Sequence, residues 1–351
     1  MKTTGFFLLL GLLTSALATA AEDTPRQATV IAVKGSVLLK RGGTGPAEAL
    51  KPGVTIAEKA NIVTQTASEV TLRFFDNTVS VIQQNSDVTV DALAAKVEGG
   101  ATTKETTLLR LRTGGIISTL DPAKKKISDF KVRTPKGVAA ARGTVFSVIV
   151  SQDQTDATVT TMSGTVTFIT DTGSITVSFG QVSTGGAVMT VAQAVAANPA
   201  IAQMFVDAAT SVAGAVGAGS ITDTAGSPNH INTVLAAVTL IACEAAPTQA
   251  GSIAGNVLTA AAPGLGSGAE ATALVIAQAA VQGVANVGGN TTQASSDVNA
   301  AILAAASAAN LSVDPSRLNS AINAGVNPST NNTILPPLDQ TQEVVSPSKT
   351  P

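Results

Sequence analysis

The stretch DFKVRTPKGVAAARGTVFSVIV, residues 129–150, decides the fold class of this chain. Apolar and polar residues alternate over residues 130–134 and again over 144–150, which is the period of half-buried β-strands. Pro135 and Gly137 lie between the two runs and favour a tight turn. The stretch therefore predicts two β-strands joined by a short connection.

Arg142 is a charged residue between these apolar runs, next to Gly143 and after a run of alanines. An unpaired charge between strands would cost several kcal/mol, so we expect backbone carbonyls or a carboxylate inside the β domain to satisfy its guanidinium. The alternative is contact with a ligand. On the structural interpretation, Arg142→Ala lowers the unfolding midpoint.

The order Thr-Pro-x-Gly, a run of small residues, and then Arg-Gly-Thr-x-Phe resembles the most recognisable segment of the FecR-type domain family of bacterial extracytoplasmic proteins. A looser likeness extends over residues 28–185. The resemblance implies an all-β fold and a location outside the cytoplasm. We expect the motif to be structural, and the residues that carry it are Thr134, Pro135, Gly137, Arg142, Gly143, Thr144 and Phe146.

Short alternating segments separated by Gly, Asn, Asp, Pro and Ser predict an all-β domain over residues 21–187. A glycine between two strand-like runs recurs at Gly35, Gly114 and Gly164, as a hairpin or bulge requires. The recurrence favours a layered architecture. Its spacing is irregular, so a β-roll and a sandwich both fit.

The composition changes after about residue 187. Residues 190–351 contain 2 basic and 8 acidic side chains, against 18 basic and 15 acidic in residues 22–189. Ala-rich stretches with Pro or Asp at their starts predict an all-α region over 188–326. The fold class is therefore multidomain α and β, an all-β domain followed by Ala-rich helices. The predicted helices are 188–197, 199–214, 229–245, 248–261, 268–286, 296–309 and 315–324.

Both ends of the chain have distinct compositions. Residues 1–20 combine Lys2, an apolar run and a small-x-small site, which predicts a cleaved signal peptide and export to the periplasm or cell surface. No Cys follows that run, so a lipid anchor there is not expected. No segment of the mature chain is expected to span a membrane. Residues 327–351 are rich in Pro and Ser and are expected to be disordered.

Composition excludes several classes of function. The net charge is −2, and Trp and Tyr are absent, so no nucleic-acid partner is expected.

Several single residues are expected to have structural roles. Cys243 is expected to be a buried small hydrophobe, and His230, at a helix start, lacks the neighbours that a metal site needs. Residues 124–126 are three lysines, expected in a solvated loop, with contact to an acidic partner as the alternative. Asp153 is expected in a turn. No cofactor is expected.

No motif for catalysis is found, so an enzyme is not expected. Two hypotheses remain. The first is a non-catalytic binding or scaffold protein of the periplasm or cell surface, in which the helices form a spacer or a surface for self-association. The second is a soluble component of envelope signalling, of the kind used in iron uptake, that works with a separate membrane partner. FecR-type proteins with full architecture carry a cytoplasmic sigma-regulating domain and a membrane helix, and this chain is expected to have a signal peptide instead.

Overall fold

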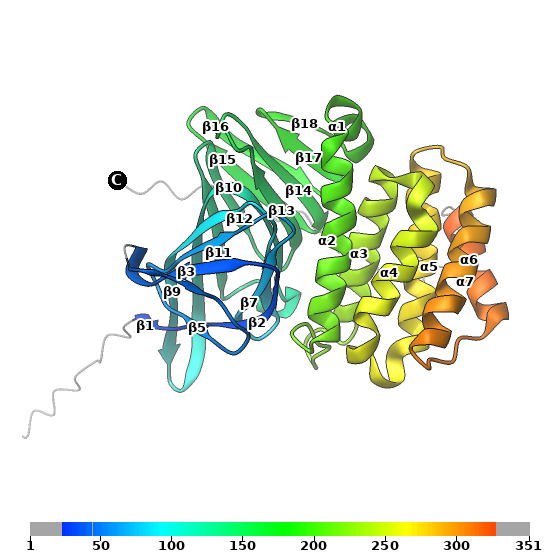
Figure 1. The fold of residues 1–351 in the computed structure, drawn as a ribbon, viewed down its shortest axis with the longest axis horizontal. Coiled ribbons are helices and arrows are strands. Elements are labelled where there is room, and N and C mark those ends of the chain that lie inside the picture. The colour runs from blue at the N-terminus through cyan, green and yellow to red at the C-terminus, as the bar shows by residue number, and fades with distance from the viewer. Residues whose placement is uncertain (1–22, 44, 328–351) are drawn as a thin grey trace, which may run out of the picture.

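The computed structural model describes residues 23–43 and 45–327. The predicted signal peptide and all but the first residue of the predicted tail lie outside the described residues. Figure 1 shows the β-strands on one side of the molecule and the helices stacked against them on the other. This order agrees with the predicted succession of a β region and a helical region.

The β region consists of two sheets in which all neighbouring strands are antiparallel, except the parallel pair β10 and β11. Sheet A has the order β4 (Ala47–Ala49), β3 (Val37–Lys40), β6 (Asn61–Thr64), β9 (Asp87–Glu98), β10 (Ala101–Thr119), β11 (Ser128–Thr134), β12 (Gly137–Ala141), β15 (Thr165–Thr170) and β16 (Gly173–Ser178), with β1 (Asp23–Pro25) also on β9. Sheet B has the order β5 (Thr55–Ile56), β2 (Ala28–Lys34), β7 (Glu69–Phe75), β8 (Thr78–Ile82), the second half of β10, β13 (Val145–Val150), β14 (Ala157–Ser163), β17 (Gln181–Thr184) and β18 (Ala187–Thr190).

The recurring glycines mark the corners where the chain passes from one sheet to the other. Gly35 lies between β2 and β3, Gly114 lies inside β10, and Gly164 lies between β14 and β15. Gly114 has a φ of 88°, and a Cβ there would lie 2.4 Å from the Cα of Ser86. Only glycine meets both demands without strain. The sequence pattern predicts hairpins or bulges, whereas the structure shows sheet-to-sheet corners at these positions.

The inner faces of the two sheets share one apolar core. Phe130 on sheet A lies between Phe74 and Phe146 on sheet B, with ring centroids 6.1 and 6.0 Å away and both pairs edge-to-face. Such aromatic pairs contribute about 0.5–1.5 kcal/mol beyond the area that they bury. Phe146 of the Arg-Gly-Thr-x-Phe segment is thus a core residue.

Sheet B is covered on both faces. Every residue of β8 and β14 is buried, although alternate side chains of a strand point to opposite faces. The outer face carries Val81, Ile117 and Val182, which belong to the same apolar cluster as the helices. Helices α1, α2 and α3 contact this face. The helical region is therefore a third layer, packed on sheet B.

Seven α-helices follow the strands within the described residues, close to the predicted ranges: α1 (Val191–Ala197), α2 (Ala200–Gly217), α3 (His230–Ala245), α4 (Ala250–Ala261), α5 (Ala269–Asn286), α6 (Thr291–Ala308) and α7 (Pro315–Val326). Two predicted starts are wrong. The sixth helix is predicted from residue 296, but α6 begins at Thr291, where Asn290 caps it by accepting a hydrogen bond from the Gln293 backbone N–H at 3.1 Å. The first helix is predicted from residue 188, but residues 188–190 belong to β18, because they pair with β17. Thr190 then caps α1 by accepting a hydrogen bond from the Gln193 backbone N–H at 3.3 Å.

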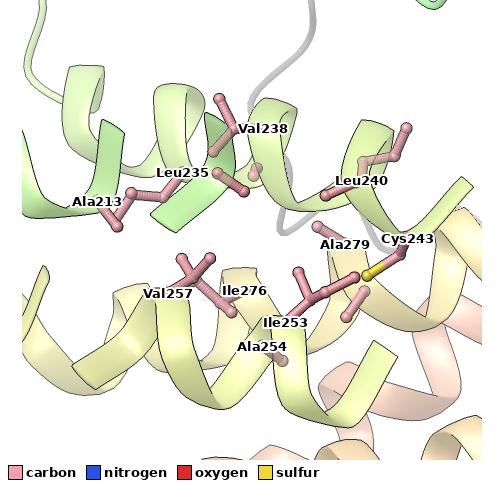
Figure 2. Packing of buried hydrophobic residues seen from close by; sticks show 14 of the residues in the cluster. Ala213, Leu235, Val238, Leu240, Cys243, Ile253, Ala254, Val257, Ile276 and Ala279 are labelled. Carbon is pink, nitrogen blue, oxygen red and sulfur yellow. The ribbon is translucent and has the colours of Figure 1, made fainter. Parts of the chain in front are cut away.

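The helices stack in two rows: α2, α4 and α6 form one row, and α3, α5 and α7 the other. From α3 onward each helix packs mainly on a helix two positions away in the chain, whereas α2 packs on both α3 and α4. Figure 2 shows small and branched side chains of α2 to α5 meeting between these rows. Cys243 lies among them, fully buried as predicted, and burial raises the pKa of its thiol. Its role is that of a small apolar side chain.

Among the described helices, α2 alone has the length and composition that a membrane span requires. This is weak support for a span, because half of that helix is buried against the rest of the protein, as in a core helix. Its buried face includes Phe205, Ala209 and Val212.

Candidate functional site: a basic groove on sheet A

The Thr-Pro-Lys-Gly part of the motif forms the turn between β11 and β12. The Thr134 hydroxyl donates to the Gly137 carbonyl at 3.0 Å and accepts from the Lys136 backbone N–H at 3.1 Å. These bonds close the turn with a side chain, which is why a Thr suits this position. Pro135 follows Thr134 at the rim of a groove.

The Arg-Gly-Thr part forms the corner between β12 and β13. The prediction that Arg142 is enclosed is wrong, because its side chain is exposed and has no hydrogen bond or ion pair within the part of the chain that the structure describes. The physical reason is the strand period: Ala139 and Ala141 point into the core, so Arg142 points outward. Gly143 makes the corner at φ 62°, and Thr144 behind it is buried.

A groove of about 600 Å³ lies on the outer face of sheet A, beside the β11–β12 turn. A row of four paired residues crosses its floor, Asn61, Thr89, Arg110 and Arg133, one each from β6, β9, β10 and β11. The groove is lined by Gly42, Gly43, Lys59, Asn61, Asp87, Thr89, Asp91, Arg110, Leu111, Arg112, Arg133, Thr134 and Pro135.

In the ion pairs of the groove, the aspartate carboxylates are mostly buried and the arginine side chains are exposed. The Arg110 guanidinium donates to Asp91 from Nε at 3.1 Å and from Nη2 at 2.6 Å, and Arg112 donates to Asp87 from Nε at 3.0 Å. The side chains of Asp91 and Asp87 are 13% and 16% exposed, against 55% and 63% for Arg110 and Arg112. The surface that a ligand would meet is therefore formed by guanidinium groups.

Positive charge exceeds negative charge in the groove. Asp91 is shared by two arginines, because Arg133 Nη1 lies 3.6 Å from its Oδ2 in addition to the pair with Arg110. Lys59 is exposed and has no partner among residues 23–43 and 45–327. The lining thus holds four cationic side chains and two carboxylates. Such a surface favours anionic ligands.

The sequence reasoning missed these groove residues, although the run Leu108–Thr113 contains a signal that could have found two of them. Arg110 and Arg112 are two positions apart on one strand, which places both on the same face of a sheet. Asp87 and Asp91 carry no such signal, because their proximity to β10 depends on strand pairing. Of the predicted motif residues, Thr134 and Pro135 line the groove, and Arg142 does not.

A second polar cluster joins the sheets to the helices. The buried Asp121 carboxylate accepts from Ser227 Oγ at 2.7 Å and Asn77 Nδ2 at 3.3 Å. Burial opposes ionisation, but these bonds and that from the Ala123 N–H together keep the pKa of Asp121 below its ordinary value. His230 is buried near Asp121, and neither ring nitrogen has a partner among the described residues.

The lysine run and the predicted Asp153 turn both lie in loops. Lys124 Nζ pairs with the buried Glu105 carboxylate at 2.9 Å, so this lysine anchors its loop to β10 rather than extending into solvent. Asp153 accepts from Ser151 Oγ at 2.6 Å and from Thr155 N–H at 3.1 Å, and these bonds hold its pKa at about 2. The described residues contain no group of three His, Cys, Asp or Glu that could hold a metal ion.

Comparison with known families gives a match to part of the chain. The family described as FecR protein matches residues 60–167, a range that contains the whole groove lining except Gly42, Gly43 and Lys59. It also contains the Thr-Pro-Lys-Gly turn and the Arg-Gly-Thr-Val-Phe corner. The resemblance to the FecR-type family is confirmed by this match.

Comparison with curated proteins finds no match. Among solved structures, the chain aligns with two crystal structures, at 2.50 and 1.65 Å resolution, described as "a putative anti-sigma factor from Parabacteroides distasonis ATCC 8503". The identity is 14% and the TM-score is 0.29, over 37% of this chain and 57% of that one. The likeness is too slight to carry an argument, and the chain spans little more than half of that protein.

Proposed function

Because the chain carries a FecR domain over residues 60–167, we propose that it is an extracytoplasmic, non-catalytic protein that binds a protein partner in envelope signalling. The observation that carries the proposal is the coincidence of the matched range with the groove on sheet A. FecR-type proteins are regulators that act through partner proteins, and the groove gathers four cationic and two acidic side chains on one open face. The partner in this proposal is an envelope or surface protein.

In this function the helical region supports the β region from the side opposite the groove. It covers the outer face of sheet B, while the outer face of sheet A, with the groove, stays open. A partner can therefore reach the FecR domain without displacing a helix. In the scaffold version of this function, the free end of the helical stack at α6 and α7 is a second contact surface, used for self-association.

A photo-crosslinking experiment tests the proposal. The full chain is expressed in its own host with a photoreactive amino acid in place of Lys136, exposed in the β11–β12 turn beside the groove, or of Ala304, exposed on α6. We expect irradiation of Lys136-substituted cells to give a crosslink to one envelope protein, and the Ala304 control to give none to that protein. Deletion of the gene for that partner should then change the same transcripts as deletion of the gene for this chain.

Two results would count against the proposal. A Lys136 crosslink that appears only with abundant cytoplasmic proteins would contradict the location. Turnover of a substrate by the purified chain, abolished by a substitution in the groove, would contradict the non-catalytic assignment.

A further inference from the structure

The groove on sheet A has a charge pattern that specifies its ligand more closely. We propose that it binds an extended acidic peptide segment of the partner, with carboxylates at alternate positions. The inference rests on the proposed function, because it names the chemistry of the protein partner. It is carried by the unbalanced charges, the free donors of the arginines and the spacing of the cations on the sheet.

The unbalanced charges come from Lys59 and Arg133. Arg110 and Arg112 each have a carboxylate of their own, Asp91 and Asp87. Arg133 only shares Asp91, at 3.6 Å, and Lys59 has no partner within the described residues. Two positive charges therefore face the groove without neutralisation. Carboxylates brought between them would form charge-assisted hydrogen bonds, which are about twice as strong as neutral ones.

The internal ion pairs show which anion the arginines accept. Arg110 holds both oxygens of the Asp91 carboxylate, since Nε donates to Oδ2 at 3.1 Å and Nη2 donates to Oδ1 at 2.6 Å, a fork geometry that fits a planar carboxylate. A guanidinium carries five N–H donors, and the carboxylates use those of Nε and one Nη, so the other donors of the exposed arginines remain for a ligand. The groove already binds carboxylates on its buried side and presents the same chemistry to solvent.

The spacing of the cations matches an extended chain. Arg110 and Arg112 lie two residues apart on β10, at most about 6.7 Å along a strand. The β9–β10 pairing shifts register between Leu111 and Thr113, and Arg112, at this irregularity, is exposed like Arg110. Arg133 is opposite Arg110 on β11, about 4.8 Å away across the sheet. Acidic side chains at positions i and i+2 of an extended peptide have a similar separation of about 6.7 Å. A strand-like acidic segment lying along β10 would therefore bring alternate carboxylates to the two guanidinium groups.

Fluorescence anisotropy with labelled octapeptides tests the inference on the full mature chain. The alternating peptide consists of four Glu-Ser repeats, the block peptide has the same composition with all glutamates before all serines, and the neutral peptide consists of four Gln-Ser repeats. We expect the alternating peptide to bind most tightly, the block peptide several-fold more weakly, and the neutral peptide not at all. Affinity for the alternating peptide should fall as salt is raised, because the Debye length shortens.

The test variant is Lys59→Gln/Arg133→Gln. It removes both unbalanced charges and leaves the Arg110–Asp91 and Arg112–Asp87 pairs in place, so the fold is preserved. We expect it to weaken binding of the alternating peptide about tenfold, the loss that corresponds to about 1.4 kcal/mol. The matched control is Lys34→Gln/Lys126→Gln, which changes the net charge equally at two exposed residues outside the groove. It should bind as the wild type does.

Four outcomes would overturn the inference: equal affinity for the alternating and block peptides, equal losses in the test and control variants, no binding of the alternating peptide, or its displacement by inorganic phosphate or anionic phospholipid vesicles at matched charge. The Lys136 photo-crosslink separates this failure from failure of the proposed function. If a partner crosslinks at Lys136 but the acidic peptide does not bind, protein binding stands and only the acidic-segment inference fails.

Discussion

Gly143 and Arg142 are neighbours in the motif, but we expect their substitution to change the stability of the protein by very different amounts. Gly143 has a φ of 62°, and a Cβ there would lie 2.8 Å from the Cα of Pro122. The Gly143→Ala change should therefore destabilise the protein by about 1–3 kcal/mol. Arg142→Ala removes an exposed side chain and should change the free energy of unfolding by less than about 0.5 kcal/mol.

Urea unfolding of both variants, followed by circular dichroism, measures the difference. The Arg142 variant is the control, since it alters the adjacent residue of the same corner. A loss of stability in Arg142→Ala as large as that in Gly143→Ala would restore the original interpretation, in which the arginine is the structural residue. If Arg142→Ala instead keeps full stability but loses the partner, the arginine belongs to a binding surface.

At the scale of single residues, sequence patterns located the motif but predicted an enclosed Arg142 side chain, whereas this side chain is exposed. The strand period was visible in residues 130–134 and 144–150, yet the alanines between them carry no polar and apolar contrast. Nothing in residues 139–141 shows which alanine faces inward. Asp87 and Asp91 could not be predicted as groove residues for a different reason: the arginines with which they pair come from another strand.

At the scale of elements, the start of α3 joins the helices to the β10–β11 connection. His230 is the first residue of α3 and is 3% exposed. Burial lowers the pKa of His230, and the charges of Asp121 and Asp223 raise it only in part. An unfolded chain binds a proton on this His below about pH 6.5, whereas the folded chain resists protonation until lower pH. Stability should therefore fall as the pH drops below about 6.5.

The His230→Gln variant tests this pH dependence. We expect the decrease in Tm between about pH 7.5 and about pH 5.5, on either side of the ordinary His pKa, to be smaller in the variant than in the wild type. Asp121 does not interfere, because its pKa is lowered from 3.8 and it titrates below this window. Burial raises the pKa of Glu244, which acts in the opposite direction but equally in both proteins. An identical pH profile in the two proteins would show that His230 is not the responsible group.

Helix ranges were the most predictable elements, because Pro and Asp mark their starts and Ala-rich runs fill them. The α7 start is an example: Asp314 accepts hydrogen bonds from the Ser316 and Arg317 backbone N–H groups at 2.7 and 3.2 Å. The short strand β18 was not predictable, since Ala187–Thr190 has no alternation, and only pairing with β17 gives it strand geometry. The pairing order of the two sheets was equally inaccessible, because it depends on contacts between distant segments.

At the scale of the whole molecule, the two halves share one apolar cluster. The composition change near residue 187 predicts two separate domains, and that division remains a prediction. The residues of sheet B that face the helices are nearly all small or branched: Val79, Val81, Ile117, Val145, Ser147, Thr160, Met162 and Val182. Polar bonds add to this contact, among them Ser211 Oγ to Glu69 Oε2 at 2.6 Å and Thr222 N–H to Asn77 Oδ1 at 3.0 Å.

Cutting the chain after Thr190, which keeps β18 whole, tests how far the β half stands alone. Residues 21–190 should give a β-type circular dichroism spectrum, because the core between the two sheets is intact. The exposed outer face of sheet B should make the fragment bind the dye ANS, self-associate in light scattering, and unfold at a lower temperature than the full chain. Each Å² of that face left in water costs about 25 cal/mol.

The double substitution Val81→Ser/Ile117→Ser separates this explanation from general loosening of the fragment. Both side chains lie on the outer face of sheet B, and they are paired neighbours on β8 and β10. In the fragment, the substitution should reduce ANS binding and self-association, because it makes the uncovered face polar. In the full chain, the same substitution should lower the Tm, because it places two hydroxyl groups beneath the helices. A monomeric wild-type fragment that binds no ANS and melts with the full chain would mean that the helices add nothing to the stability of the β half.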